Sequence, residues 1–509
     1  MWKKALRRLV LGLALLAACG GGKPAGRDAG SSVASVDAGE GPDFALELTP
    51  QPLGLPTVEA YGYAFGPGQK HFRKALAARE HGDWQTVRAA CEAAIAADPG
   101  HLEAHRTLAS ALGALHVDAG VARHLSIALA GDWMRWGPGW ERDAQLATYL
   151  AGARGARIRE LMSGYRSEYL RRVLKGLLVV ARRQPVRPLR KGVQDVLLRA
   201  EVFAWDGESA RFLRVTRTNL GIAGWLRSPA GDQLAWVAYT RVRVTPEGAT
   251  QLVDARVGAV DLNLPAMSPR NVKLNDVPAL RLEFDPRGRL YATTGDLLGA
   301  DRKLARTWQL DVLGGRARAA RTRGSAGRQL LVTAEDAHVL DVAPAHVEAD
   351  WDAPTAAEAA AGAFRLANTR KTVTLPTGEY ARRSSFVWSP GEARVAFATR
   401  ADACAADAAA RRASLYVVDA ATGRLRVVAS GERGLAAAWL DDDRLAFEDG
   451  EGGVRVLDVQ SGAEVTRLVA GGGVGLAGIA GKPSCAAVAP GEEPEPATEP
   501  EAPPEPEEE

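Results

Sequence analysis

The sequence has few residues of the kinds that carry catalytic chemistry, with 4 cysteines and 8 histidines among 509 residues. It contains no G-x-S-x-G elbow, no H-E-x-x-H pair and no glycine-rich phosphate loop. Beyond the N-terminus, no stretch approaches the eighteen consecutive apolar residues of a membrane-spanning helix. We therefore expect a protein that is not an enzyme, needs no cofactor and has no second membrane span.

The N-terminal residues combine positive charge with a short apolar run. Lys3, Lys4, Arg7 and Arg8 precede the run Leu9–Leu16, which is too short to span about 30 Å of hydrocarbon and is typical of a signal peptide. The run ends in Leu-Ala-Ala-Cys at Cys19, which resembles the lipobox of bacterial lipoproteins. The alternative is an ordinary signal peptide with a chance cysteine.

This resemblance implies that residues 1–18 are removed and that Cys19 is lipidated, which would anchor the protein to a membrane. Gly20 stands where inner-membrane lipoproteins often have Asp, so the resemblance favours the outer membrane of a Gram-negative cell. Whether the protein faces the periplasm or the cell surface stays open. Three cysteines remain in such an exported chain, and Cys404 with Cys485 is the pair that could form a disulfide.

Residues 20–42 and the C-terminal tail have too few large apolar residues to form a core, whereas the segment up to Gly66 has scattered prolines and aromatic residues and could lie along the first domain. Residues 19–66 begin with a stretch rich in Gly, Ser, Ala and Asp, and we interpret them as the lipidated cysteine and a flexible tether. Residues 490–509 contain nine glutamates among Pro, Ala, Thr and Gly, which predicts a disordered acidic tail.

Helical periodicity covers residues 67–152. Gly-Asp-Trp at Trp84, small Ala94, the Pro99 stop and Leu108 in the following helix resemble a tetratricopeptide repeat, with a degenerate second copy behind it. The resemblance implies packing roles for these four residues and a groove that binds other proteins.

Residues 153–192 contain a basic amphipathic helix candidate at 154–183. Positions 154–191 hold twelve Arg or Lys residues and only two glutamates, opposite a stripe that includes Ile158, Tyr165 and Leu177. Such a helix could bind anionic lipid or lipopolysaccharide, or it could simply brace the two neighbouring domains. Nucleic-acid binding is not expected, because the chain carries an export signal and its positive charge is restricted to this one helix.

From residue 193 to residue 489 the period changes from 3.6 to 2. Four segments begin with an aromatic residue and a turn and continue in strands, the second of which ends in Asp; a weaker fifth copy starts at Arg328. The aromatic residues are Trp225, Phe284, Trp388 and Trp439. Gly423 and Gly462 each stand four residues beyond such an Asp and predict hairpin turns.

These copies resemble the blades of TolB-type, WD-repeat-like β-propellers. The expected fold is therefore a short tetratricopeptide-like helical domain followed by a β-propeller of about six blades. In such propellers the aromatic residue packs between neighbouring blades.

Metal binding has two weak candidates. His101 and His105 lie four residues apart on one helix face, although structural or solvated histidines explain them better. The run Asp441–Asp443 could bind calcium, but acidic residues are also ordinary in hairpin turns. We therefore predict no metal.

Both expected folds commonly present binding surfaces, so the sequence favours an envelope-anchored scaffold that binds other envelope proteins. The alternatives are a propeller enzyme acting on envelope glycan or peptide, and a passive binder of a polysaccharide or small ligand. The sequence does not identify the partner.

We predict that the Cys19→Ala variant incorporates no lipid, because the lipobox requires the thiol. Metabolic labelling with radioactive palmitate would show this directly. Equal labelling of the variant and the unmodified protein would contradict the lipoprotein interpretation.

Overall fold

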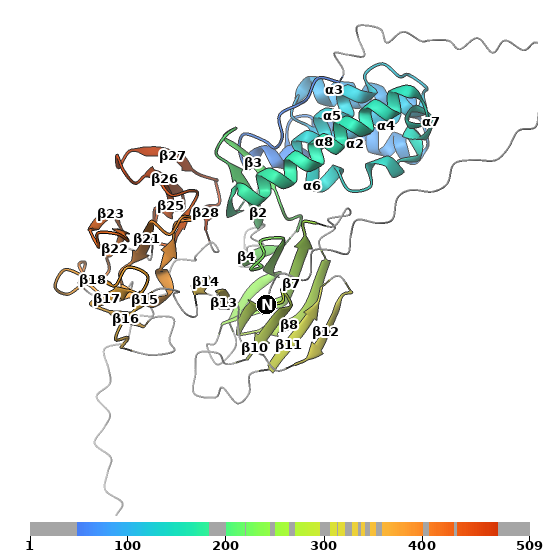
Figure 1. Cartoon of the computed structure of the whole chain (residues 1–509). Helices are drawn as coiled ribbons and strands as arrows, with labels where there is room; N and C mark the ends of the chain where they lie inside the picture. Colours follow the sequence, from blue (N-terminus) through green and yellow to red (C-terminus); the bar gives the residue numbers. More distant parts are fainter. Residues whose placement is uncertain are drawn as a thin grey trace, which may run out of the picture. The chain divides into compact units, whose positions relative to one another are not determined.

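A helical region is followed by antiparallel strands (Figure 1). The structure, a computed structural model, describes residues 48–476 except 183–199, 219, 245–249, 264–269, 296–305, 313, 321–327, 334–336, 342–346, 353–358, 401–406 and 432–434. The predicted signal peptide, Cys19, the acidic tail, Cys404 and Cys485 lie outside these described residues. Among the described helices, none has both the length and the apolar character needed to cross a membrane.

The helical region consists of several short helices, which pack successively against one another, and the longer α8. Their bounds are η1 Glu59–Phe65, α2 Gln69–Glu80, α3 Trp84–Ala97, α4 Leu102–Ala114, α5 Val121–Gly131, α6 Trp133–Trp136, η2 Trp140–Arg142, η3 Ala144–Leu146, α7 Ala147–Ala151 and α8 Ala153–Lys175. Helix α2 contacts α3, α3 contacts α4, and α4 contacts α5. Gly82 adopts φ +71° in the turn before α3, and the Asp83 side chain caps that helix by accepting from the Thr86 amide.

The segment before α2 contributes to the core, so the tether is shorter than the predicted 19–66. Leu53, Val58 and Tyr61 are buried, and the Gly54 amide donates to the carbonyl of Ala130 in α5 at 2.9 Å. Leu55 pairs with Phe212 in an isolated β-bridge. The tether is shorter because the apolar and aromatic side chains of this segment stabilise the fold when they are buried away from water.

The long basic helix also ends earlier than predicted. Helix α8 stops at Lys175, and β1 begins at Leu177, well before the boundary that the sequence placed at residue 193. Five consecutive apolar residues, including Val179 and Val180, fit a strand that is covered on both faces. Leu177 therefore belongs to a sheet, and the apolar stripe of α8 ends at Val173.

The strands form seven sheets in the described residues, all with antiparallel pairing. The strand orders are β28-β1-β2-β3, β4-β5-β7-β6 with β8 beside β7, β12-β11-β10-β9-β13-β14, β15-β17-β18, β16-β19, β20-β21-β22-β23 and β24-β25-β26-β27. The strand bounds are β1 Leu177–Arg182, β2 Ala200–Asp206, β3 Arg211–Arg214, β4 Gly221–Arg227, β5 Gln233–Tyr239, β6 Arg241–Val244, β7 Thr250–Asp261, β8 Arg270–Val277, β9 Ala279–Phe284, β10 Leu290–Thr294, β11 Arg306–Asp311, β12 Arg316–Ala319, β13 Arg328–Thr333, β14 Ala337–Asp341, β15 Val347–Glu348, β16 Ala360–Ala361, β17 Ala363–Leu366, β18 Lys371–Thr374, β19 Ala381–Arg382, β20 Val387–Trp388, β21 Arg394–Ala398, β22 Ala413–Asp419, β23 Leu425–Gly431, β24 Ala437–Trp439, β25 Arg444–Glu448, β26 Val454–Asp458, β27 Glu464–Leu468 and β28 Val474–Gly475.

One sheet joins the two ends of the strand-forming region. Strand β28 pairs with β1, so that Val180 stands opposite Gly475 and Ala181 opposite Val474. The first and last described strands are thus hydrogen-bonded neighbours although nearly 300 residues separate them. The weaker fifth copy, by contrast, does not form a sheet of its own, because β13 pairs with β9 and extends the sheet of Phe284.

The Asp–Gly pattern of the sequence corresponds to hairpin turns. The carboxylate of Asp419 accepts hydrogen bonds from Thr422, and that of Asp458 accepts from Gln460 and Ser461. Gly423 and Gly462 follow with φ +75° and +76°, a conformation that glycine adopts without steric cost. The two predicted hairpins are confirmed.

A buried ion cluster connects the helices to the first sheet. The Arg214 guanidinium in β3 lies 3.1 Å from Asp132 at the end of α5 and 3.1 Å from Glu201 in β2, and all three side chains are at most 4% exposed. The guanidinium also covers the Tyr61 ring at 4.6 Å, and the Tyr169 hydroxyl of α8 donates to the Arg214 carbonyl at 2.6 Å. Burial by itself lowers the pKa of Arg214, but the two carboxylates raise it overall, so the side chain stays charged.

We predict that Arg214→Ala lowers the free energy of unfolding by about 3–5 kcal/mol, because it leaves two buried carboxylates without their counter-ion. Urea denaturation followed by helical circular dichroism measures the loss. The control is Arg243→Ala, which removes an exposed ion pair with Asp276 and should cost less than about 1 kcal/mol. Equal effects of the two substitutions would show that the cluster does not stabilise the fold.

Candidate binding surfaces

The residues assigned to repeat packing lie in the helical core or at its edge. Ala94 and Leu108 are buried, and Trp84 is partly buried at the start of α3. A methyl group at Gly68 would stand 2.5 Å from the Ala94 carbonyl oxygen, so the chain approaches α3 closely there. The carbonyl of Pro99 interacts with His105 at 3.1 Å.

Helix α4 presents no open groove to a partner, contrary to what the repeat resemblance implies. Ten of its thirteen residues are buried. Besides α3 and α5, both η1 and η3 contact it, and a methyl group at Gly113 would stand 2.4 Å from the Gln145 carbonyl oxygen. The chain itself therefore covers the surface at which a peptide could lie along α4.

His101 and His105 use their ring nitrogens on different partners and do not form a metal-binding pair. His101 caps α4, where Nδ1 accepts from the Ala104 amide and Nε2 lies 3.2 Å from Gln69 Oε1. His105 instead lies 2.9 Å from His124 on α5, Nδ1 to Nδ1. Among the described residues, no group of three or more His, Cys, Asp or Glu side chains could hold a metal ion.

The Nδ1 atoms of His105 and His124 face each other, so only one of the two can carry a proton. Since His105 Nε2 must donate to the Pro99 carbonyl, the neutral His105 accepts from His124 through Nδ1. Burial lowers the pKa of His105. Burial, with His105 and Arg123 nearby, lowers the pKa of His124 to about 4. The pair is consequently neutral in the folded protein near pH 7.

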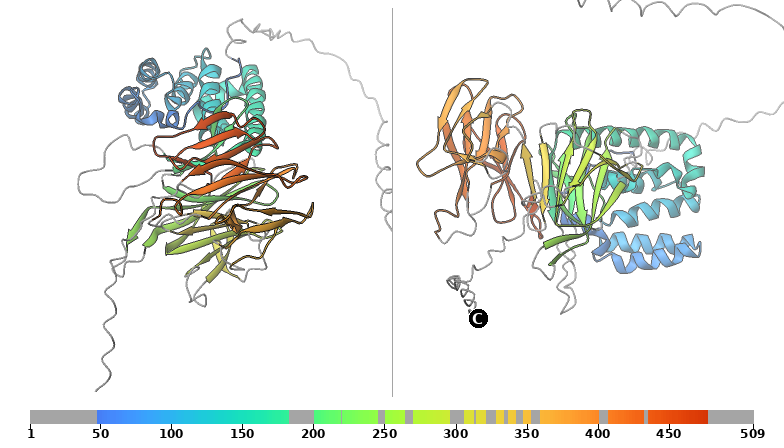
Figure 2. Two further views of the ribbon diagram at one scale, coloured as in Figure 1. Left: turned by 90° about the vertical axis from the view of Figure 1, so that its left-hand side faces the viewer. Right: turned by 90° about the horizontal axis from the view of Figure 1, so that it is seen from below.

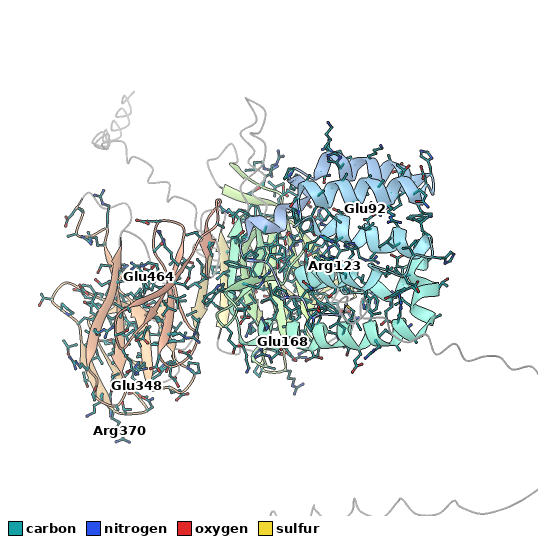
Figure 3. The ribbon with its side chains drawn as sticks, turned by 90° about the horizontal axis from the view of Figure 1, so that it is seen from above. Glu92, Arg123, Glu168, Glu348, Arg370 and Glu464 are labelled. Carbon is teal, nitrogen blue, oxygen red and sulfur yellow. The ribbon has the colours of Figure 1, made fainter. Side chains whose placement is uncertain are left out.

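Two arginines near the end of α8 are paired with carboxylates within the fold. Glu168 binds Arg171 at 2.7 Å and Arg172 at 2.6 Å, and Arg172 also binds Asp206 of β2 at 2.7 Å. Hydrogen bonding to Arg171 is the main cause that lowers the pKa of Glu168 to about 2. Figure 3 labels Glu168 on this helix. The sequence could not reveal Asp206 as a partner, because it lies more than thirty residues away in a strand.

The four aromatic residues of the strand copies differ in burial. Phe284 is 1% exposed, whereas Trp225, Trp388 and Trp439 are partly buried. The Trp439 indole N–H donates to the Val387 carbonyl at 3.0 Å and thereby joins the last two sheets.

The carboxylates of the Asp441–Asp443 run each have a different partner. Asp441 binds Arg444 at 2.7 Å, Asp442 accepts from the Gly391 amide at 2.7 Å, and Asp443 binds Arg394 at 2.8 Å. These contacts stabilise a turn and connect it to the preceding sheet, which is the ordinary structural use of such residues.

The end strands of the last two sheets carry exposed apolar side chains that sequence reasoning missed. Val427 on β23, Val465 on β27 and Val469 just beyond β27 are 50%, 49% and 55% exposed. Arg426 on β23 donates to the carbonyl of Gln460, in the turn between β26 and β27, at 3.1 Å. Figure 2 shows these sheets in orange and red, and Figure 3 labels Glu464, which pairs with Arg455 at 2.6 Å. We call Val427, Val465 and Val469 the outer-strand surface.

No known family profile matches this chain, and no curated protein does. Among solved structures, TolB from Acinetobacter baumannii is 10% identical with a TM-score of 0.33, and the match covers 60% of this chain and 66% of TolB, slightly less than two thirds of its length. The Cps50 (Swd1) β-propeller domain of Myceliophteria thermophila is 13% identical with a TM-score of 0.26, covering 50% of this chain and 87% of that domain. Uncharacterised protein lmo1340 from Listeria monocytogenes is 9% identical with a TM-score of 0.30, covering 54% and 92%. These TM-scores are low, and the strand pairing of this chain itself defines its fold.

We predict that acidification from pH 6.5 towards pH 4 destabilises the helical region. An unfolded histidine binds its proton near pH 6.5, whereas folded His124 does so only near pH 4, so stability is lost as the pH falls through this window. The slope should reach at most about 1.4 kcal/mol per pH unit for one proton.

Thermal melts of the His124→Asn variant should depend less on pH over this range than those of the unmodified protein. His81→Asn, at an exposed position after α2, is the matched control and should retain the full slope. An unchanged slope in the His124 variant would show that the histidine pair does not take up the proton.

Proposed function

We propose that this protein is a lipid-anchored scaffold of the bacterial envelope that binds other envelope proteins. The lipidated Cys19 would hold it in the outer membrane of a Gram-negative cell, and the tether would separate the folded part from the bilayer. The observation that carries the binding role is the outer-strand surface.

The chemistry of the outer-strand surface favours contact with protein. Val465 and Val469 lie four residues apart at the end of β27, and exposed apolar side chains that lie together can mark an interaction site. Strands β23 and β27 are also the last strands of their sheets, so one edge of each has backbone groups that no described strand pairs. An extended segment of another protein could add to such an edge through main-chain hydrogen bonds.

The proposal includes a β-propeller and a tetratricopeptide-like unit as the two folded modules. Three of the seven described sheets have four antiparallel strands, and β28 joins the two ends of the strand region, both features of β-propellers, here proposed with about six blades. The successive packing of α2 to α5 fits a tetratricopeptide-like unit. In this interpretation the helices serve mainly as a structural module, since α4 is covered by the chain itself.

We predict that partner proteins co-purify with the full-length protein from detergent-solubilised membranes and are lost from the Val465→Lys, Val469→Lys double variant. A buried lysine would require desolvation of its charge at the interface, which disfavours binding. Quantitative mass spectrometry of the two purifications measures the difference.

The matched control is Leu174→Lys, which changes an exposed apolar residue of α8 outside the outer-strand surface. It should retain the same partners as the unmodified protein. If the double variant also retains them, the outer-strand surface is not the contact site.

A further inference from the structure

A pocket in the helical region is separate from the outer-strand surface. It has a volume of about 370 Å³ and lies between the Gly137–Arg142 loop and one side of α8. Helix α6, which precedes the loop, packs against α8 (Figure 1). Gly137 allows the loop to lie against the Trp133 ring, because a methyl group there would stand 2.5 Å from that ring.

The charged residues of the pocket are Arg142, Arg159, Arg166 and Glu141. Three guanidinium groups against one carboxylate give the pocket an excess of positive charge. Arg159 donates one N–H to the Leu150 carbonyl at 2.9 Å, which orients its guanidinium while leaving other donors. Unlike Arg171 and Arg172, neither Arg142 nor Arg166 forms an ion pair with a described residue.

Two donors at this pocket are buried without an acceptor in the described part of the chain. They are the Nε of Arg166 and the indole Nε1 of Trp133, a residue that is only 5% exposed. An unsatisfied buried donor is costly. Other arginine and tryptophan donors of the described residues share this state, but these two lie beside a pocket with excess positive charge, which favours a ligand that supplies acceptor oxygens and negative charge.

We propose that this pocket binds a phosphate monoester. The dianion of a phosphate monoester matches three arginines opposed by one glutamate, and its three terminal oxygens can accept from several donors at once. Trp140 and Met162 provide apolar walls for the organic part of the ligand. The same group occurs on soluble phosphorylated metabolites and on lipid headgroups such as phosphatidic acid, and the experiment distinguishes the two sources.

The test is isothermal titration calorimetry on the full-length protein in detergent. The probes are glycerol 3-phosphate, short-chain phosphatidic acid and, as a carboxylate of similar charge, succinate. We expect at least one phosphate monoester to bind and succinate to bind more weakly. Tighter binding of phosphatidic acid would identify a lipid source, and tighter binding of glycerol 3-phosphate a soluble one.

Arg166→Gln and Arg142→Gln should each weaken the binding of the phosphate probe about tenfold or more, the effect of losing a charged hydrogen-bond donor. Arg142 is exposed in the loop, so its variant tests the pocket even if Arg166→Gln perturbs α8. The control is Arg73→Gln on the exposed side of α2, which removes the same charge elsewhere in the helical region and should leave affinity unchanged.

Three results would overturn the proposal: no binding of either phosphate probe, preferential binding of succinate, or equal weakening by Arg73→Gln. The pocket and the outer-strand surface share no residue. If the Arg142 variant loses phosphate binding but still co-purifies the partner proteins, the result therefore tests the pocket and leaves the proposed scaffold function intact.

Discussion

The carboxylates of Asp132 and Glu201 could not remain buried without the guanidinium of Arg214 between them. Desolvation of two carboxylates is expensive, and only close opposite charge with further hydrogen bonds offsets it. Because Asp132 ends a helix, Glu201 and Arg214 lie in strands, and Tyr61 comes from the N-terminal segment, their contacts hold three parts of the chain in one arrangement.

The binding surfaces that we propose follow from what this core leaves exposed. The end strands of the last two sheets have no described strand beyond them, so Val427 and Val465 stay in solvent. In the helical region, Arg159 and Arg166 of α8 form no ion pair with a described residue, whereas Arg172 near its end binds Glu168 and Asp206. One surface suits an apolar protein contact and the other suits an anion, so the two proposed ligands need not compete.

Local chemistry explains why the strand copies were recognisable. An Asp that accepts from the following amides, and a glycine four residues later with positive φ, are properties of the turn itself and do not depend on the neighbouring sheets. The pairing of whole copies is different. The copy that starts at Arg328 extends a neighbouring sheet, because the edge of β9 is available to it, and no local pattern encodes that choice.

The sequence by itself determined the order of helices before strands, the helix stripe of Ile158 and Tyr165, and the two hairpin turns, since each depends on periodicity or on residues close in the chain. Only the tertiary structure decided where α8 gives way to β1, which partners the arginines of α8 take, and that His105 faces His124 rather than His101. These outcomes depend on contacts between residues far apart in sequence, and a single sequence does not specify which distant side chains meet.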